Sequence, residues 1–163
     1  MLKPIRAKKA SAAAERFAVI ASSYNARYVN SMLRAAKRTL ITSGAEVEVV
    51  RVPGAFEIPA IAASFAGRTD RPFGAIICLG VILRGETTHA QHIAEAVSHA
   101  LAQIQIRYHK PVIHEVLLLE SEEQAKARCL DQKHNRGMEA ALTAIEMARL
   151  IKRLANANVQ KQR

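Results

Sequence analysis

The sequence predicts an α/β protein, a three-layer sandwich in which helices cover both faces of a four-stranded parallel sheet. Short β-branched apolar runs alternate along the chain with segments of helical periodicity, and the connections are long enough for parallel crossovers. The segment 73–80 is almost entirely apolar, as expected of a central strand covered on both faces. The 163 residues, half of them apolar, suffice for one domain with its own core.

Four segments are predicted to be strands. The first is a buried apolar run, RFAVIAS, and the second, AEVEVVRV, begins with the alternation of a strand that has one partly wet face. The third is the apolar run FGAIICLG, and the fourth follows Pro111. The expected ranges are 16–22, 45–52, 73–80 and 112–119.

Five helices are expected between and after these strands. Apolar residues recur at helical spacing after Asn25 until a stop at Gly44, and Pro59 is tolerated in the first turn of a short helix. Ser121 and Gln124 form a capping-box signature. The helix that contains Pro59 is expected at 57–66, and two longer helices are expected at 88–108 and 137–154.

The formal net charge of +10 is concentrated at the two ends. Residues 1–9 contribute +4 and residues 148–163 contribute +5, so the region 10–147 is nearly neutral. We therefore expect a basic N-terminal arm (1–15), a single α/β domain (16–155) and a basic C-terminal tail (156–163), with no nucleic-acid partner. Polyanion binding through the two ends stays open as an alternative, which would show as salt-sensitive RNA binding.

Composition also excludes several classes of protein. No apolar run approaches the roughly 18 residues of a membrane-spanning helix, and the N-terminus lacks a signal-like apolar region, so we expect a cytoplasmic protein without a membrane partner. Cys78 and Cys129 have neither framework nor zinc spacing, and Cys129 has no evident base partner. The histidines form no metal-ligand pattern, so neither a metal nor a cofactor is predicted.

In a parallel α/β sheet, ligands bind beyond the carboxyl ends of the strands. This rule selects the loops 22–25, 52–57 and 80–89. The third has the glycine spacing of a phosphate-binding loop, but Glu86 stands where the lysine is required, which argues against a nucleoside triphosphatase. Thr87 and Thr88 at a helix start could instead hold a single oxyanion, although Thr88 could also be no more than a cap.

Three further side chains are candidates for chemistry or binding. His89 lies in the first turn of a helix and off its apolar stripe, and the helix dipole there favours a neutral imidazole able to exchange protons. Arg128 and Arg136 are central cations that the basic ends do not explain. An exposed arginine at a helix end is the alternative for each.

Several motifs, in order along the chain, resemble the 6,7-dimethyl-8-ribityllumazine synthase family. They are SSYN at 22–25, VPGAFEIP at 52–59, RGETTH at 84–89, EQA at 123–125 with Arg128, and NRG at 135–137 leading to Glu146-Met147. The resemblance covers roughly Phe17 to Leu150, and VPGAFEIP and RGETTH are individually quite specific. It implies a flavodoxin-like fold.

The resemblance also implies a reaction. The family condenses 5-amino-6-(D-ribitylamino)uracil with 3,4-dihydroxy-2-butanone 4-phosphate and releases phosphate and water, without a cofactor or metal. By this resemblance His89 transfers protons, Arg128 binds the phosphate and Tyr24 stacks on the pyrimidine. The remaining implied substrate-binding residues are Ala55, Phe56 and Glu57 for the ribityl chain, Val81, Ile82 and Leu83 as a loop beside the pyrimidine, Glu86 and Thr87 for the phosphate, and His114 and Arg136.

The chain departs from the family pattern at several positions. His114 stands where phenylalanine is usual, Arg136 where lysine is common, and Tyr24 where phenylalanine is commoner. Ala90-Gln91 replaces a frequent aromatic-aspartate pair, which leaves the neighbours that orient His89 undefined. Because none of these changes removes a catalytic group, an active enzyme is expected.

The family assembles as pentamers, sometimes as decamers or sixty-subunit shells, with each active site shared by adjacent subunits. The resemblance therefore implies a homo-oligomer in which His114, Arg128 and possibly Arg136 face Tyr24, Glu57 and His89 across an interface. The N-terminal arm is expected to dock on a neighbour. A non-catalytic flavin- or lumazine-binding paralogue is the alternative function, against which His89 and Arg128 argue, since storage needs neither a proton shuttle nor a phosphate ligand.

Overall fold

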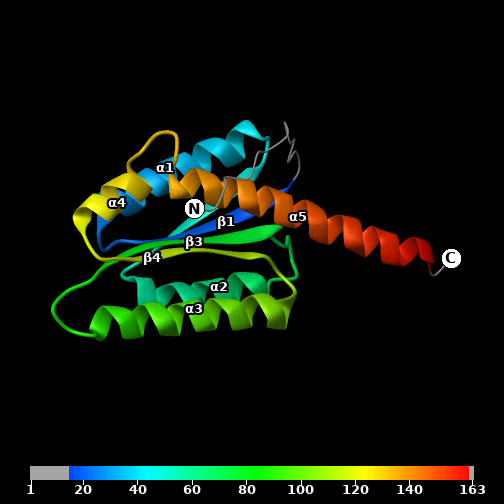
Figure 1. Cartoon of the computed structure of the whole chain (residues 1–163). Coiled ribbons are helices and arrows are strands. Elements are labelled where there is room, and N and C mark those ends of the chain that lie inside the picture. The colour runs from blue at the N-terminus through cyan, green and yellow to red at the C-terminus, as the bar shows by residue number, and fades with distance from the viewer. Residues whose placement is uncertain (1–14, 162–163) are drawn as a thin grey trace.

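The computed structural model describes residues 15–161 as a sheet between two helical layers (Figure 1). The strands are β1 (Arg16–Ser22), β2 (Glu46–Val52), β3 (Ala75–Leu83) and β4 (Val112–Leu119). The helices are α1 (Ala26–Thr42), α2 (Ile58–Ala66), α3 (His89–Tyr108), α4 (Glu122–Cys129) and α5 (Arg136–Lys161), with a 3-10 turn at Ala55–Glu57 before α2. This confirms the predicted three-layer, flavodoxin-like α/β fold.

The sheet has the order β2-β1-β3-β4 and all its strand pairs are parallel. The pairing of β1 with β2 ends at Ser22 opposite Val52, and that of β3 with β4 ends at Leu83 opposite Leu119. The carboxyl ends of the four strands therefore lie along one edge of the sheet, which we call the carboxyl edge. β2 and β4 are the outer strands.

Two apolar clusters fill the space between the layers. Alternate residues of β1 and β3, such as Val19 and Ile77, pack against α1, α4 and α5, while their neighbours Ile20 and Ile76 pack against α2 and α3. Figure 1 shows the same division, with α2 and α3 on one side of the sheet and the other helices opposite. Both central strands are buried over nearly their whole length, as the unbroken apolar runs predicted.

The main correction to the predicted elements concerns β3, which was expected to end at Gly80. The strand continues to Leu83, and the segment 81–83 pairs with residues 117–119 of β4. Gly80 does not end the strand but leaves room for its neighbours, since a Cβ atom there would lie 3.1 Å from Val116 Cγ1 and 3.4 Å from Ile58 Cδ1. Val81, Ile82 and Leu83 therefore belong to a strand, and the prediction that they form a loop was wrong.

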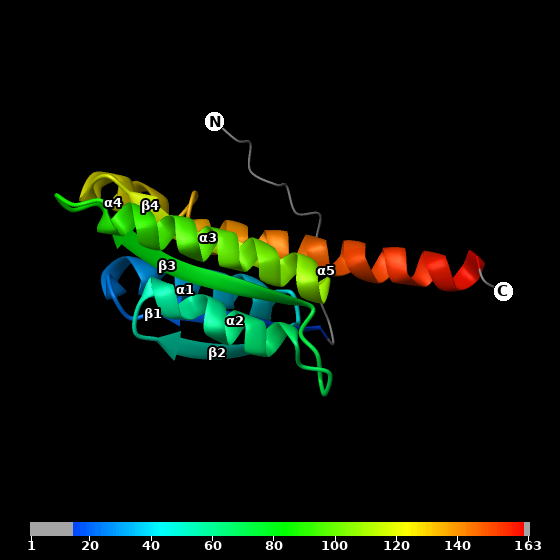
Figure 2. The same ribbon diagram turned by 90° about the horizontal axis from the view of Figure 1, so that it is seen from below.

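The last helix is also longer than predicted. α5 runs to Lys161 rather than ending near Leu154, and its C-terminal part extends beyond the sheet (Figure 2). No glycine or proline follows Gly137, so the helix continues after its apolar stripe has ended. The predicted boundary between the domain and the C-terminal tail, after residue 155, stays a prediction. Residues 1–14 of the predicted N-terminal arm lie outside the described part of the chain. No helix in the described part is long and apolar enough to cross a membrane.

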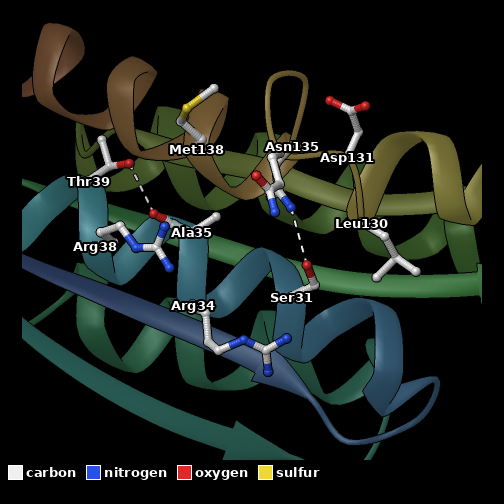
Figure 3. Close-up of a pocket in the computed structure, with 10 residues that line it drawn as sticks. Ser31, Arg34, Ala35, Arg38, Thr39, Leu130, Asp131, Asn135 and Met138 are labelled. Carbon is white, nitrogen blue, oxygen red and sulfur yellow. Dashed lines mark hydrogen bonds between the residues drawn. The ribbon is translucent and has the colours of Figure 1, made fainter.

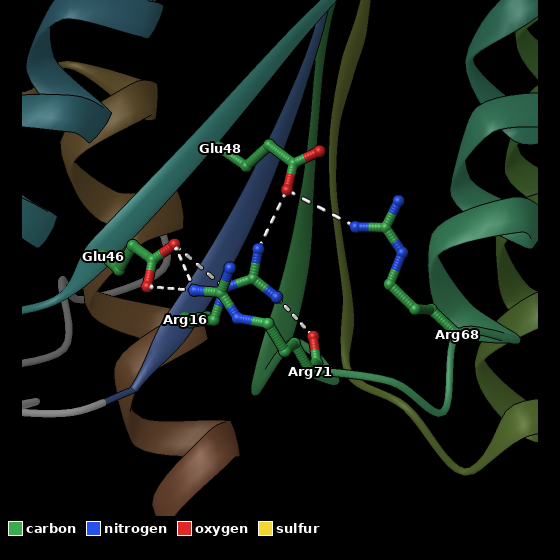
Figure 4. Close-up of polar contacts among 5 residues, drawn as sticks. All are labelled: Arg16, Glu46, Glu48, Arg68 and Arg71. Carbon is green, nitrogen blue, oxygen red and sulfur yellow. Dashed lines mark hydrogen bonds and ion pairs between the residues drawn. The ribbon is translucent and has the colours of Figure 1, made fainter.

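A network of ion pairs joins the opposite, amino-terminal ends of β1 and β2 to the connection after α2 (Figure 4). Arg16 donates from Nε to Glu46 at 3.1 Å and from a terminal nitrogen to Glu48 at 3.0 Å. Arg71 also bonds Glu46, and Arg68 lies 3.5 Å from Glu48. Because the side chain of Arg16 is only 14% exposed, this network orders that end of the sheet more than an isolated surface pair would.

Gly137 provides a test of how α5 packs on α1. A Cβ atom at this position would lie 2.0 Å from the carbonyl oxygen of Met32, which is backbone and cannot move aside. We expect Gly137→Ala to lower the free energy of unfolding by roughly 1–3 kcal/mol or more. Gly85→Ala is the matched control, because nothing lies within 4 Å of the added methyl group. Urea unfolding followed by circular dichroism would measure both, and equal stability of the two variants would contradict this packing.

Candidate active site

The turns after β1 and β2 are joined at the carboxyl edge. The backbone N–H of Ser23 donates to the carbonyl of Val52 at 2.8 Å, and that of Tyr24 donates to the carbonyl of Pro53 at 3.1 Å. Asn25 follows in a left-handed conformation, with φ of 54°, and begins α1. The first two predicted loops are therefore neighbours in space, as expected for adjacent parallel strands.

Gly54 allows Tyr24 and Glu57 to approach the same piece of backbone. The Gly54 N–H donates to Glu57 Oε2 at 2.8 Å, and a Cβ at Gly54 would lie 2.9 Å from that oxygen and 3.2 Å from Tyr24 Cδ2. Glu57 Oε1 stays available to accept hydrogen bonds from a hydroxylated ligand. The rings of Tyr24 and Phe56 are 72% and 62% exposed, while Ala55 is buried below them.

The third loop begins only after β3, so it covers residues 84–88. The side-chain amide of Asn25 donates to the carbonyl of Val81 at 2.7 Å, which ties the end of β3 to the first turn. Arg84 is anchored to β4 by a backbone bond to Leu119 and an ion pair with Glu120 at 2.8 Å. All three loops therefore meet at the carboxyl edge.

His89 is the first residue of α3, as predicted, and its side chain is exposed. Thr88 is the N-cap residue, but its side chain makes no capping hydrogen bond, whereas Thr87 Oγ1 accepts weakly from the His89 N–H at 3.4 Å. Glu86 and Gly85 are exposed as well. The helix start therefore presents open N–H groups and hydroxyls, the arrangement that binds an oxyanion.

His114 does not lie at this edge. It pairs with Cys78 in the sheet, five positions before Leu119, which corresponds to about 16 Å along the strand. Its Nδ1 accepts from the Val116 N–H at 3.3 Å, so its proton lies on Nε2, 2.8 Å from Ser98 Oγ on α3. Desolvation lowers the pKa of His114 from its ordinary value of 6.5.

A buried carboxylate, which the sequence did not reveal, holds Arg136 on the other face of β4. Glu115 is 5% exposed and accepts from Arg136 Nε at 3.0 Å and from a terminal nitrogen at 2.7 Å. Arg136 also pairs with Glu139 at 2.5 Å. Burial raises the pKa of Glu115, and the charges of Arg136 and the exposed Arg128 oppose that rise. Both candidate arginines thus belong to the surroundings of β4.

The predicted site residues consequently form two groups within one chain. We call the first the carboxyl-edge group, and it comprises Tyr24, Ala55, Phe56, Glu57, Val81, Ile82, Leu83, Glu86, Thr87 and His89. The second, the β4 group, comprises His114, Arg128 and Arg136. His114 is separated from the carboxyl edge by the length of its strand, and β4 is an outer strand of the sheet.

The two cysteines are poor nucleophiles in this structure. Both are buried, and burial raises the pKa of the Cys129 thiol to about 11 and that of Cys78 further. Among the described residues, no three His, Cys, Asp or Glu side chains are grouped so as to hold a metal ion.

Sequence reasoning missed residues that organise these two groups. Asn25 was noted only as the last residue of the SSYN motif and as the position after which a helix begins, although its amide tethers the end of β3. The Ser22 hydroxyl is buried at the end of β1 without a hydrogen-bond partner in the described part of the chain. Glu115 lies between His114 and Val116 in the strand sequence VIHEVLLL, and no sequence signal marked it as the partner of Arg136.

The fold is that of a flavodoxin-like protein, and the strand-end loops and the start of α3 form its candidate ligand site. A family model for 6,7-dimethyl-8-ribityllumazine synthase matches residues 14–152. Three proteins of that name are similar to the chain. The one from Stenotrophomonas maltophilia (strain R551-3) is 38% identical, and the match covers 85% of this chain and 90% of that protein. The one from Xanthomonas euvesicatoria is 39% identical, with 85% of this chain and 91% of that protein covered. The one from Aquifex aeolicus is 38% identical, with 90% of this chain and 96% of that protein covered. The chain belongs to the 6,7-dimethyl-8-ribityllumazine synthase family.

The environment of His114 predicts how stability depends on pH. Because its pKa is lower in the folded protein than the ordinary 6.5, the unfolded chain binds this proton first as the pH falls. Stability contributed by the neutral imidazole is complete above pH 6.5 and is lost below it. We expect His114→Gln, which cannot titrate, to lose less stability than wild type between pH 7 and about 5. Equal slopes in urea unfolding across this range would contradict the assignment.

Proposed function

We propose that this protein condenses 5-amino-6-(D-ribitylamino)uracil with 3,4-dihydroxy-2-butanone 4-phosphate to give 6,7-dimethyl-8-ribityllumazine, phosphate and water. It is then a transferase of riboflavin biosynthesis. The observation that carries the proposal is the family match over residues 14–152, which spans both groups of site residues. The geometry at the carboxyl edge agrees with the needs of the substrates.

Each part of the carboxyl edge suits one part of the reaction. A flat heterocycle can stack on the exposed ring of Tyr24, and the free oxygen of Glu57 can accept from the ribityl hydroxyls. The open start of α3, with Thr87 and the backbone at Glu86, suits the phosphate. Val81, Ile82 and Leu83 contribute from the end of β3, as strand residues rather than as a loop.

The chemistry requires proton transfer and positioning more than a strong nucleophile. The primary amine attacks the ketone carbonyl and a first water leaves to form an imine. Phosphate is then eliminated, the resulting enol tautomerises to a ketone, and the second amine attacks that carbonyl and expels a second water to close the ring. His89, exposed at the start of α3, can accept and return the protons of these steps. Holding both substrates in contact supplies much of the remaining acceleration.

We further propose that the complete site lies between two subunits of a homo-oligomer, a pentamer or a multiple of pentamers, in the cytoplasm. Within one chain His114 lies well before the carboxyl end of β4, and β4 is an outer strand that a neighbour can approach. Arg128 of one subunit would then bind the phosphate at the α3 start of the next. Arg136 already donates to Glu115 and Glu139, so its proposed role is to hold β4 and the start of α5 in place rather than to bind the phosphate directly.

Two substitutions separate the proposed roles. His89→Ala should lower kcat about tenfold to a hundredfold, because proton transfer is lost while binding remains. Arg128→Ala should raise the KM for the phosphate substrate about tenfold or more, because a charge-assisted contact is removed. Formation of the lumazine, followed by absorbance, and phosphate release measure both effects. His99→Ala is the control, an exposed histidine farther along α3. Wild-type kinetics in both test variants would exclude the site assignment.

A shared site can be tested by mixing the two impaired variants and assaying them at a phosphate-substrate concentration below the raised KM of Arg128→Ala. If His89 and Arg128 act together across an interface, unfolding and refolding a mixture of His89→Ala and Arg128→Ala chains should restore sites that contain both side chains. The mixture should then be more active than either variant alone, whereas the double variant mixed with either single variant should gain nothing. Light scattering should give a particle of five or a multiple of five 17.9 kDa chains. A monomer, or a mixture without recovery, would refute the shared site.

A further inference from the structure

A pocket lies between α1 and the start of α5, and none of the predicted site residues lines it (Figure 3). Its volume is about 500 Å³, within the range of small-molecule sites. One wall is the middle of α1, and the other is formed by the α4–α5 connection and the first turn of α5. The lining residues are Ser31, Arg34, Ala35, Arg38, Thr39, and residues 130–132, 135 and 138.

The pocket has a cationic wall whose charge the protein does not neutralise. Arg34 and Arg38 are one helical turn apart on α1 and both are exposed, so their guanidinium groups can bracket one ligand. Within the described residues neither arginine side chain makes a hydrogen bond or an ion pair. α1 contains no acidic residue at all, so nothing on the same helix balances them.

The single carboxylate in the pocket lining is already engaged in shaping its loop. Asp131 Oδ1 accepts from the N–H groups of Lys133 and His134, both at 2.7 Å, and these bonds lower the pKa of Asp131. Its second oxygen can still accept from a ligand hydroxyl. Asp131 therefore stays ionised without pairing with Arg34 or Arg38.

The rest of the lining is rigid and partly apolar. Asn135 is buried and donates to Ser31 Oγ at 3.3 Å, while its Oδ1 accepts from the Gly137 N–H at 2.9 Å, so the start of α5 is fixed against α1. The Ser31 hydroxyl hydrogen remains available to a ligand. Half-buried Leu130 and Met138 provide apolar surface beside these polar groups.

We propose that this pocket binds a small phosphorylated metabolite whose phosphate is held by Arg34 and Arg38. Guanidinium groups bind phosphate through paired, charge-assisted hydrogen bonds, and two of them one turn apart match a dianion. Hydroxyl groups on the organic part would meet Asp131 and Ser31. The pocket uses neither His89 nor Arg128, so it is separate from the condensation site, and its existence does not depend on the proposed reaction.

The test uses ribose 5-phosphate, ribose and inorganic phosphate as probes in calorimetric titrations of the full-length protein. Ribose 5-phosphate should bind, phosphate should bind more weakly and ribose should not bind measurably. Arg34→Gln/Arg38→Gln should raise the Kd for ribose 5-phosphate about tenfold or more. Because both side chains are exposed and lack partners in the described part of the chain, the double variant should keep the wild-type melting temperature.

Two controls locate the binding. Lys37→Gln removes a neighbouring exposed charge of α1 that does not line the pocket, and it should leave the Kd unchanged. Arg128→Ala should also leave it unchanged. Binding that is lost in Arg128→Ala but kept in the double α1 variant would place the phosphate in the condensation site and overturn the pocket. No binding to wild type, or equal loss in Lys37→Gln, would overturn it as well. Absence of lumazine formation would reject only the proposed reaction.

Discussion

The parallel register of β1 between β2 and β3 is the constraint on which the candidate active site depends. It brings three chain segments, separated by tens of residues, to one edge of the sheet, where Tyr24, Glu57 and His89 follow their strands. Local hydrogen bonds then hold these loops together, since Tyr24 is bonded to Pro53 and Asn25 to Val81. Substitutions in the buried faces of β1 would therefore disturb binding as well as stability.

The outer strand β4 has a different character, because it combines apolar burial with two titratable side chains on adjacent residues. His114 contacts Ser98 of α3 and desolvation lowers its pKa, while Glu115 bonds Arg136 at the start of α5, which opposes the rise in the Glu115 pKa that burial causes. A buried carboxylate with a bidentate guanidinium specifies geometry, since breaking the pair would leave a charge without compensation. This gives the replacement of lysine by Arg136 a structural basis, because the planar guanidinium donates one hydrogen bond to each carboxylate oxygen.

Most of the fold could be predicted because its signals are local. β1 and β4 have the predicted bounds, and α2 begins one residue later than predicted, with Pro59 in its first turn. The errors arose where a local signal competes with a tertiary contact. Gly80 resembles a strand end, yet β3 continues past it in register with β4, and Val116 and Ile58 occupy the space that a side chain at this position would need. α5 continues beyond the end of its apolar stripe, since no helix-breaking residue follows Gly137.

From the sequence alone came the class of fold, the family and the identity of the residues that can carry chemistry, because periodicity and short motifs are properties of neighbouring positions. Only the tertiary structure decided which of those residues meet. Some of them lie at the carboxyl edge and others around β4. Arg136 is paired with Glu115. Arg34 and Arg38 line a pocket and have no carboxylate partner among the described residues. Such contacts join positions far apart in the chain, and their distances follow from how helices and strands pack rather than from any local pattern.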